Sequence, residues 1–370
     1  MARNRAAIVV SPEAHFIALC AREPDAVHGH AIPSAAAAVR DWDAVVTTAA
    51  PHGVTAFVRQ AAVRDAIRLP ERADRALRRA ALVALTQVMR LDSELARAVG
   101  ALAAAAVPVI VLKGPVLART IYPAATLRPY GDIDLSVQER HEDAAATALL
   151  GCGFAEIAHG PEIARRAHAG HVHQGAAYHR KFVAGDGEAL VELHTDPLQL
   201  GLKPSCERGR WQRATPVPYL PGALMLCPED QLVQLGVHAH KHGYNRLIWL
   251  KDLDLLLRAH GGLDWDLVAQ VARREGVTAS VWYSLHLASE LLRAPVPHSV
   301  LARLSPAPPL RALYGRVWPT SRIGNLDGHM RRRAVQFHAA DSWRGMLPNL
   351  VLMGRRHIRA RAILRAVLQR

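Results

Sequence analysis

The stretch that decides the fold is residues 107–137, which read VPVIVLKGPVLARTIYPAATLRPYGDIDLSV. Its opening, residues 107–112, is a β-branched run entered through a proline, and this pattern predicts a buried strand. Helical spacing resumes over residues 116–122, after a Lys-Gly-Pro turn. A second strand is predicted over residues 133–137. The stretch therefore indicates a strand–helix–strand unit near the centre of the chain.

Helical patterns flank this unit, because apolar residues recur there at three and four positions. A β-hairpin is also predicted, with strands over residues 178–183 and 189–195 around a Gly-Asp-Gly turn. The segments predicted to be helical are 61–69, 73–99, 139–150, 229–242, 245–260, 264–274 and 279–292.

These segments predict an α+β fold in which a small mixed β-sheet forms the core. Residues 1–98 are assigned to a helical N-terminal region, and residues 99–220 to the α/β core. Residues 221–370 are assigned to a helical C-terminal domain that ends in a basic tail at residues 355–370. The tail alternates arginine with isoleucine and leucine. It is typical of a solvated amphipathic helix, and docking to a polyanion is the alternative.

Composition limits the class of protein. The net charge is +14, but the basic residues are spread along the chain and are mostly arginine beside abundant alanine, as a GC-rich genome produces. The longest nearly apolar stretch, residues 99–112, is shorter than the roughly 20 residues of a membrane span. Four scattered cysteines form neither a disulfide framework nor a cysteine zinc site. The sequence also has no P-loop and no dinucleotide fingerprint. We expect a soluble, cytoplasmic protein without a membrane partner.

Three carboxylates carry the predicted chemistry. Asp132 and Asp134 share one face of a strand because side chains alternate, and Glu192 shares a face with His194 in the hairpin. Carboxylates that repel one another on half-buried strands favour a bound cation. Mg²⁺ or Mn²⁺ suits such an oxygen-rich set. An Asp-x-Asp pair alone also occurs at exposed strand edges, so this interpretation depends on the neighbouring motifs.

Those motifs resemble the uncharacterised nucleotidyltransferase family of bacterial genomes, which belongs to the DNA polymerase β-like nucleotidyltransferase superfamily. The resemblance covers residues 107–257. The residues that carry it are Leu112-Lys113-Gly114, Tyr122-Pro123, Arg128-Pro129, Gly131-Asp132-Ile133-Asp134-Leu135, Val191-Glu192-Leu193-His194, His238, Lys241-His242 and Leu250-Lys251-Asp252-Leu253.

The resemblance implies roles for individual residues. Asp132, Asp134 and Glu192 would ligate the metal, and Glu192 would also accept the proton of the attacking hydroxyl. Lys113 and Gly114 would hold the phosphates. The chain departs from the superfamily here, because the usual Gly-Ser is replaced by Lys113-Gly114-Pro115 and the spacing from Gly114 to Asp132 is longer.

Arginine and histidine complete the predicted site. Arg128 would neutralise phosphate charge. The residues predicted to line a substrate pocket are His194, His238, Lys241, His242 and Asp252. For the histidines, ordinary hydrogen bonding or a helix-surface position is the alternative. Asp252 would orient Lys241 or Arg246, or else form an ion pair on a helix surface.

The function that these assignments predict is transfer of a nucleoside monophosphate from an NTP to an acceptor. A peptide or small molecule, as in natural-product biosynthesis, is the acceptor favoured by the resemblance. RNA, including tRNA, is the alternative. A non-catalytic protein of the same fold that binds a nucleotide or a partner is the rival from another class.

Overall fold

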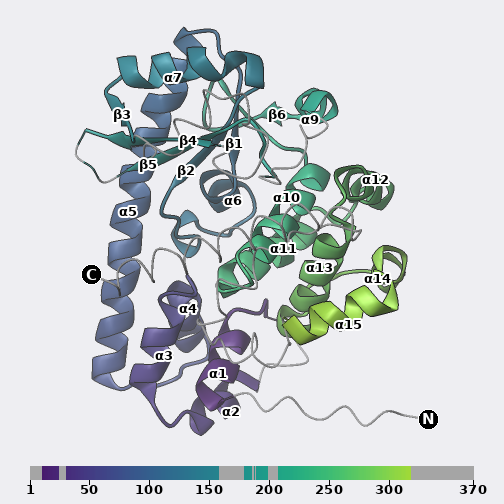
Figure 1. Ribbon diagram of the computed structural model, residues 1–370. Helices are drawn as coiled ribbons and strands as arrows, with labels where there is room; N and C mark the ends of the chain where they lie inside the picture. The colour runs from purple at the N-terminus through teal and green to yellow at the C-terminus, as the bar shows by residue number, and fades with distance from the viewer. Residues whose placement is uncertain are drawn as a thin grey trace, which may run out of the picture.

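The computed structural model describes residues 11–24, 31–157, 179–185, 187, 189–198 and 207–317. The predicted basic tail at residues 355–370 and the first residue of the predicted hairpin lie outside these ranges. The described chain contains one mixed seven-stranded sheet, in the order β3-β4-β5-β2-β1-β7-β6, which lies in the upper part of the molecule in Figure 1. The predicted α+β class is confirmed.

The sheet brings the two central strands of the sequence prediction together with the hairpin. β1 (Val109–Leu112) pairs antiparallel with β2 (Ile133–Ser136). β2 in turn pairs parallel with β5 (Leu190–His194), and β5 pairs antiparallel with β4 (His179–Ala184). The predicted strands and hairpin are therefore confirmed. The hairpin supplies the neighbour of β2.

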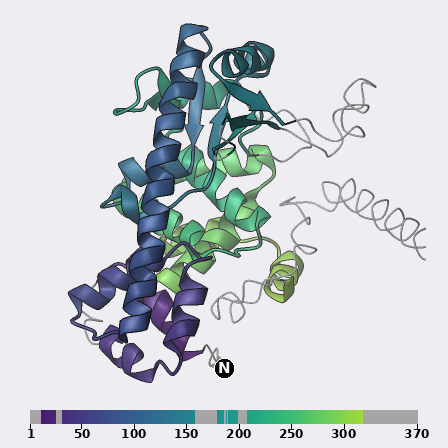
Figure 2. The same ribbon diagram turned by 90° about the vertical axis from the view of Figure 1, so that its left-hand side faces the viewer.

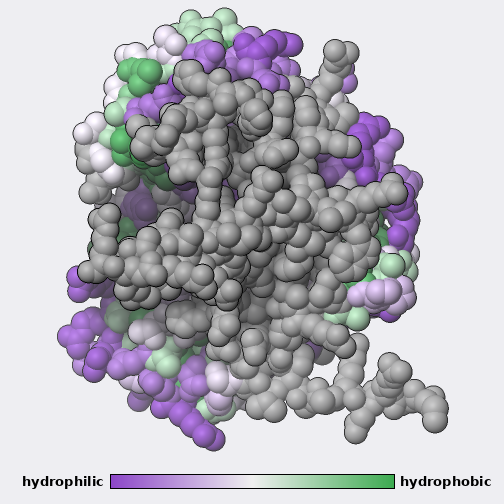
Figure 3. Space-filling model, in the orientation of Figure 1, coloured by the Kyte–Doolittle hydropathy of each residue, from purple (hydrophilic) through white to green (hydrophobic). Residues whose placement is uncertain are grey.

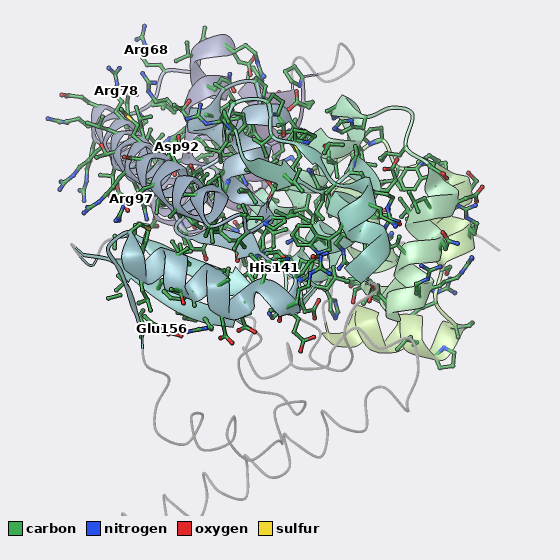
Figure 4. The ribbon with its side chains drawn as sticks, turned by 90° about the horizontal axis from the view of Figure 1, so that it is seen from above. Arg68, Arg78, Asp92, Arg97, His141 and Glu156 are labelled. Atoms are coloured by element: carbon green, nitrogen blue, oxygen red, sulfur yellow. The ribbon has the colours of Figure 1, made fainter. Side chains whose placement is uncertain are left out.

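The two faces of the sheet differ in what covers them. Val109 and Val111 of β1 pack with α5 (Glu71–Ala104) and α7 (Glu142–Gly151) in one core. Ile110 and Leu112 point to the other face and pack with Leu226. Because Leu112 is paired with Asp134, the acidic residues belong to this second face, away from α5 and α7. Figure 4 shows α5 and α7 side by side, with Arg78 and Arg97 on α5.

The helices on either side of the sheet in sequence form one shared core. Phe16 and Ile17 of α1 pack in the same cluster as Leu232 of α10, Leu253 of α11 and Leu285 of α13. α5 begins after Pro70, where the sequence predicts the break, and extends from these helices to the sheet (Figure 2). The other elements of this layer are α1 (Pro12–Cys20), α2 (Ala31–Ala38), α3 (Trp42–Ala49), α4 (Thr55–Arg64), α10 (Pro228–Lys241), α11 (Leu247–Ala259), α12 (Trp265–Glu275), α13 (Thr278–Leu292), α14 (His298–Leu304) and α15 (Pro308–Val317).

Some elements differ from the prediction. α6 (Gly114–Thr120) begins two residues earlier than expected, directly at the Lys-Gly turn. Three short strands were not predicted because two or three residues are too few to show alternation. One of them, β7, pairs parallel with β1 and lies just beyond residue 220. The additional elements are η1 (Ala125–Leu127), η2 (Glu139–His141), β3 (Phe154–Glu156), α9 (Glu207–Arg213), β6 (Thr215–Pro216) and β7 (Ala223–Met225).

Figure 3 shows hydrophobic residues gathered at the upper left of one face, over α7 and β3. Leu150 and Ile157 are among the exposed large apolar side chains, and scattered apolar residues of this kind are normal. Within the described ranges, no helix has both the length and the apolar character needed to cross a bilayer.

Candidate active site

The pairing of β2 with β5 places two carboxylates side by side. Asp134 is the direct register partner of Glu192, and Ser136 is the partner of His194. In a parallel pair, register partners project from the same face, so both carboxylates and the imidazole lie together. Asp134 is 3% exposed and His194 is fully buried, whereas Glu192 is half-buried. The strands thus position an acidic cluster with one open side.

Asp134, Glu192 and His194 form a set that can hold a metal ion. One ligand atom from each lies within 4.8 Å of the other two. His194 Nε2 is 2.8 Å from Asp134 Oδ1 and 3.8 Å from Glu192 Oε2. Two carboxylates and one imidazole suit Mn²⁺, and they suit Mg²⁺ when water supplies the remaining ligands. The residues present therefore fit the divalent ion that the sequence predicts.

Two lysines balance the charge of the cluster. Lys113 Nζ lies 3.0 Å from Asp134 Oδ2, and Lys181 Nζ lies 2.7 Å from Glu192 Oε1. Burial acts to raise the pKa of Asp134, but Lys113 and the hydrogen bond from His194 outweigh it and hold that pKa well below its usual range. Asp134 is therefore an anion at neutral pH.

Asp132 lies at the edge of this cluster. It precedes β2 by one residue, is half-buried, and is outside the three-residue set within 4.8 Å. Burial and the negative charges of Asp134 and Glu192 raise its pKa, against the opposing effect of Lys113 and Arg128. Asp132 is therefore within electrostatic range of the other two carboxylates.

Lys113 and Gly114 form the tight turn between β1 and α6. Lys113 has a φ of 53°, a left-handed conformation that is strained in a residue other than glycine. Gly114 lies against Tyr130: a Cβ on Gly114 would be 2.6 Å from the Cβ of Tyr130. The glycine thus allows the loop before Asp132 to approach the turn that carries Lys113.

Gly114→Ala tests this close approach. We expect the variant to lower the free energy of unfolding by about 1–3 kcal/mol, because the Cβ of Tyr130 cannot rotate away and the backbone must shift. Urea denaturation followed by circular dichroism measures the change. Gly100→Ala is the matched control, since nothing lies within 4 Å of a Cβ there. Equal stability of the two variants would contradict the close contact.

Arg128 and Asp252 bind each other. Arg128 donates from Nε to Asp252 Oδ1 at 2.6 Å and from Nη2 to Asp252 Oδ2 at 2.7 Å, and Tyr122 Oη donates to Asp252 Oδ1 at 2.6 Å. Arg128 is 4% exposed and Asp252 is fully buried. Asp252 is therefore paired in the interior, with Arg128 and Tyr122, and not on a helix surface. The pair ties the loop before Asp132 to α11.

His238 and Lys241 lie on α10, and His242 directly follows its last residue; all three are near the acidic cluster. The rings of His238 and His242 are 4.6 Å apart and both contact the Trp249 ring. Burial, with the charge of Lys113, lowers the pKa of Lys241 to about 8, while Glu192 and Asp134 oppose this shift. Burial also lowers the pKa of His238 well below its ordinary value. The predicted pocket residues of α10 are thus brought within electrostatic range of the carboxylates.

His242 gives a pH-dependent prediction. Burial of the imidazole and the charges of Lys241 and Lys113 lower its pKa from 6.5 to about 4, although the residue as a whole is exposed. Between these values the unfolded chain binds the proton and the folded chain does not, so stability falls as pH decreases from 6.5 towards 4. His242→Gln should make the unfolding midpoint in urea fall less steeply over this window. Parallel pH profiles of the two proteins would contradict the prediction.

Lys181 and Tyr130 are site residues that the sequence pattern alone does not predict. Lys181 is the register partner of Glu192 across the hairpin. Counting outward from the middle of the Gly-Asp-Gly turn would instead pair Lys181 with Val191, so the local pattern misses the observed register by one residue. Tyr130, which packs on Gly114 and donates to Asp92, has no comparable local signal.

A mixed sheet that presents two carboxylates and a histidine within ligand distance is typical of a metal-binding enzyme core. A profile of the family described as "uncharacterised nucleotidyltransferase" matches residues 38–293. The match spans more than half of the chain, and the chain belongs to this family. Membership indicates a transferase with a nucleotide substrate. No curated protein matches the chain.

Proposed function

We propose that the protein transfers a nucleoside monophosphate from an NTP to an acceptor hydroxyl or phosphate. The observation that carries this proposal is the cluster of Asp134, Glu192 and His194 on adjacent strands, in a chain of a nucleotidyltransferase family. An acceptor oxygen forms a bond to the α-phosphorus, the bond from that phosphorus to the bridging oxygen breaks, and pyrophosphate leaves. The proton of an acceptor hydroxyl passes to Glu192.

Asp134, Glu192 and His194 would hold a divalent ion, with Asp132 close enough to contribute. Such an ion, Mg²⁺ or Mn²⁺, supplies positive charge to the phosphates and to the oxygens that exchange at phosphorus. Lys113 would leave Asp134 and place its ammonium on a phosphate once the nucleotide binds. Lys241, which is in electrostatic range of the same cluster, would bind phosphate beside it. His238 and His242 would line the nucleotide pocket.

Arg128 and Asp252 have a positioning role in this proposal. Their buried pair uses the guanidinium fork that phosphate would need, so Lys113 and Lys241 are the better phosphate ligands. Arg128 instead fixes the loop that leads to Asp132.

The experiment that tests the proposal measures binding and turnover together. Calorimetry with Mg²⁺ and each NTP in turn should show binding of one or more nucleotides that is lost without the divalent ion. Release of pyrophosphate from the bound NTP should follow once a deproteinised small-molecule extract is added as the source of acceptor. Nucleotide binding without any consumption of NTP would count against the proposal.

A non-catalytic nucleotide-binding role is the second candidate, and one observation favours it. Lys113 and Lys181 already neutralise Asp134 and Glu192, as they would in a structural cluster that needs no metal. In that case Mg²⁺ should leave the affinity for the NTP unchanged. The calorimetric comparison with and without Mg²⁺ separates the two candidates.

A further inference from the structure

A groove of about 580 Å³ opens beside the loop that precedes Asp132. One wall is α5, the second is the turn between α3 and α4 with the start of α4, and the third is the loop of residues 126–131. The volume lies within the roughly 300–1,000 Å³ that is typical of sites for small molecules. Its lining residues do not include Lys113, Lys241, His238 or His242, so the groove is separate from the proposed phosphate ligands.

Much of the groove is lined by alanine, which makes its wall apolar. Ala76, Ala80 and Ala84 lie four positions apart on α5, so they share one face of that helix. Each is partly exposed. Because these three alanines have short side chains, they leave a trough along α5 that larger side chains would fill. The apolar part of a ligand can therefore lie along α5.

The charged side chains of the groove are both cationic. Arg79 and Arg246 line it, and no aspartate or glutamate does. Within the described part of the chain, Arg79 is exposed and forms no ion pair. Arg246 is held in place: its Nε donates to the carbonyl of Pro51 at 3.0 Å. The groove thus complements a negative charge.

The absence of a side chain at Gly53 leaves room for the guanidinium of Arg246. Gly53 has a φ of 71°, and a Cβ there would lie 3.1 Å from Nη2 of Arg246. Arg246 also interacts electrostatically with Asp132. Gly131 lines the groove and Asp132 follows it directly. The groove therefore reaches the residue before Asp132, and Arg246 lies within electrostatic range of that carboxylate.

We propose that this groove is the acceptor site, and that the acceptor is a small molecule with an apolar body and an anionic group that pairs with Arg79 and Arg246. The oxygen that attacks phosphorus lies at the Gly131 end, beside Asp132. This inference rests on the proposed nucleotidyl transfer for its acceptor role, while the binding of an anionic apolar ligand stands independently of it.

A matched pair of fluorescent probes tests the chemistry of the groove in the full chain. Anilinonaphthalene sulfonate carries an apolar body with an anionic group, and N-phenyl-1-naphthylamine is the same body without the charge. Both are titrated with and without Mg²⁺ and the α,β-methylene analogue of ATP, which binds but cannot transfer its nucleotide. We expect the sulfonate probe to bind more tightly than the neutral probe and to leave the affinity for the ATP analogue unchanged.

Three variants separate the contributions of shape and charge. Ala80→Trp fills the trough and should weaken both probes by about tenfold or more, which corresponds to about 1.4 kcal/mol. Arg79→Gln combined with Arg246→Gln should weaken the sulfonate probe by about tenfold and the neutral probe by less than about twofold. Leu82→Trp is the control, because Leu82 is on α5 and 63% exposed but does not line the groove. It should bind both probes as the unmodified chain does.

Other outcomes would overturn the proposal. Equal probe binding by the Ala80→Trp and Leu82→Trp variants would show that the probes do not occupy the groove. Displacement of the ATP analogue by the sulfonate probe would make the groove a nucleotide pocket. Conversion of a dimer to a monomer by Ala80→Trp, measured by sedimentation, would make it an interface between copies of the chain. If the probes behave as expected but no NTP is consumed, the proposed function and the acceptor role fail, and the anionic-ligand site remains.

Discussion

Asp134→Asn should reduce Mg²⁺-dependent nucleotidyl transfer by at least about 10²-fold, because it removes the most buried carboxylate of the candidate metal site. The substitution keeps the shape of the side chain but removes the negative charge that balances Lys113. Transfer is measured as incorporation of label from an α-labelled NTP. Asp132→Asn should lower incorporation as well, because the Asp132 carboxylate is within electrostatic range of Asp134 and Glu192.

Two controls show whether the loss of incorporation is specific to the candidate metal site. Asp143→Asn removes a carboxylate that is fully exposed and outside the cluster, and it should leave the incorporation unchanged. Circular dichroism of each variant shows that the fold persists, which is needed because Asp134 is buried. Unchanged incorporation in both Asp134→Asn and Asp132→Asn would contradict the proposed mechanism.

Asp252→Ala should lower the free energy of unfolding by about 3–5 kcal/mol, because it leaves the buried guanidinium of Arg128 without its partner. The hydroxyl of Tyr122 loses its acceptor at the same time. Urea denaturation measures the loss. Asp74→Ala breaks an ion pair on the surface of α5 and should have little effect.

A double variant distinguishes a lost partner from a general packing defect. Arg128→Met with Asp252→Leu removes both charges, so it should recover part of the stability that Asp252→Ala loses. Activity should not recover in the double variant, because the loop before Asp132 is no longer tied to α11 by the pair. A stability of Asp252→Ala close to that of the unmodified chain would contradict the buried network.

The sequence predicts the centre of the fold well because its signals there are local. The β-branched run that forms β1 and the alternation across β2 require no knowledge of distant residues. The hairpin of β4 and β5 is equally local, since a Gly-Asp-Gly turn separates its strands. The placement of Glu192 beside Asp134 then depends on one further fact, the parallel pairing of β2 with β5, which no local pattern in the sequence predicts.

The parts that could not be predicted are contacts between residues far apart in the chain. Arg128 and Asp252 are separated by 124 positions. The sequence around each residue does not indicate that it is buried or paired. The groove between α5, α4 and the loop before Asp132 could not be predicted either. Alanines are common in helices, and only the folded chain shows that α4 and the loop lie opposite these ones. Short strands such as β7 are recognisable only from their pairing with β1.

The most direct test of the central claim is one reaction that contains an α-labelled and a γ-labelled NTP, Mg²⁺ and a deproteinised small-molecule extract as the source of acceptor. Nucleotidyl transfer predicts that the α label enters a new acid-stable product while the γ label appears as pyrophosphate. Both changes should require the divalent ion and disappear in Asp134→Asn. Transfer of the γ label, or its release as orthophosphate, would show a different phosphoryl chemistry and contradict the account.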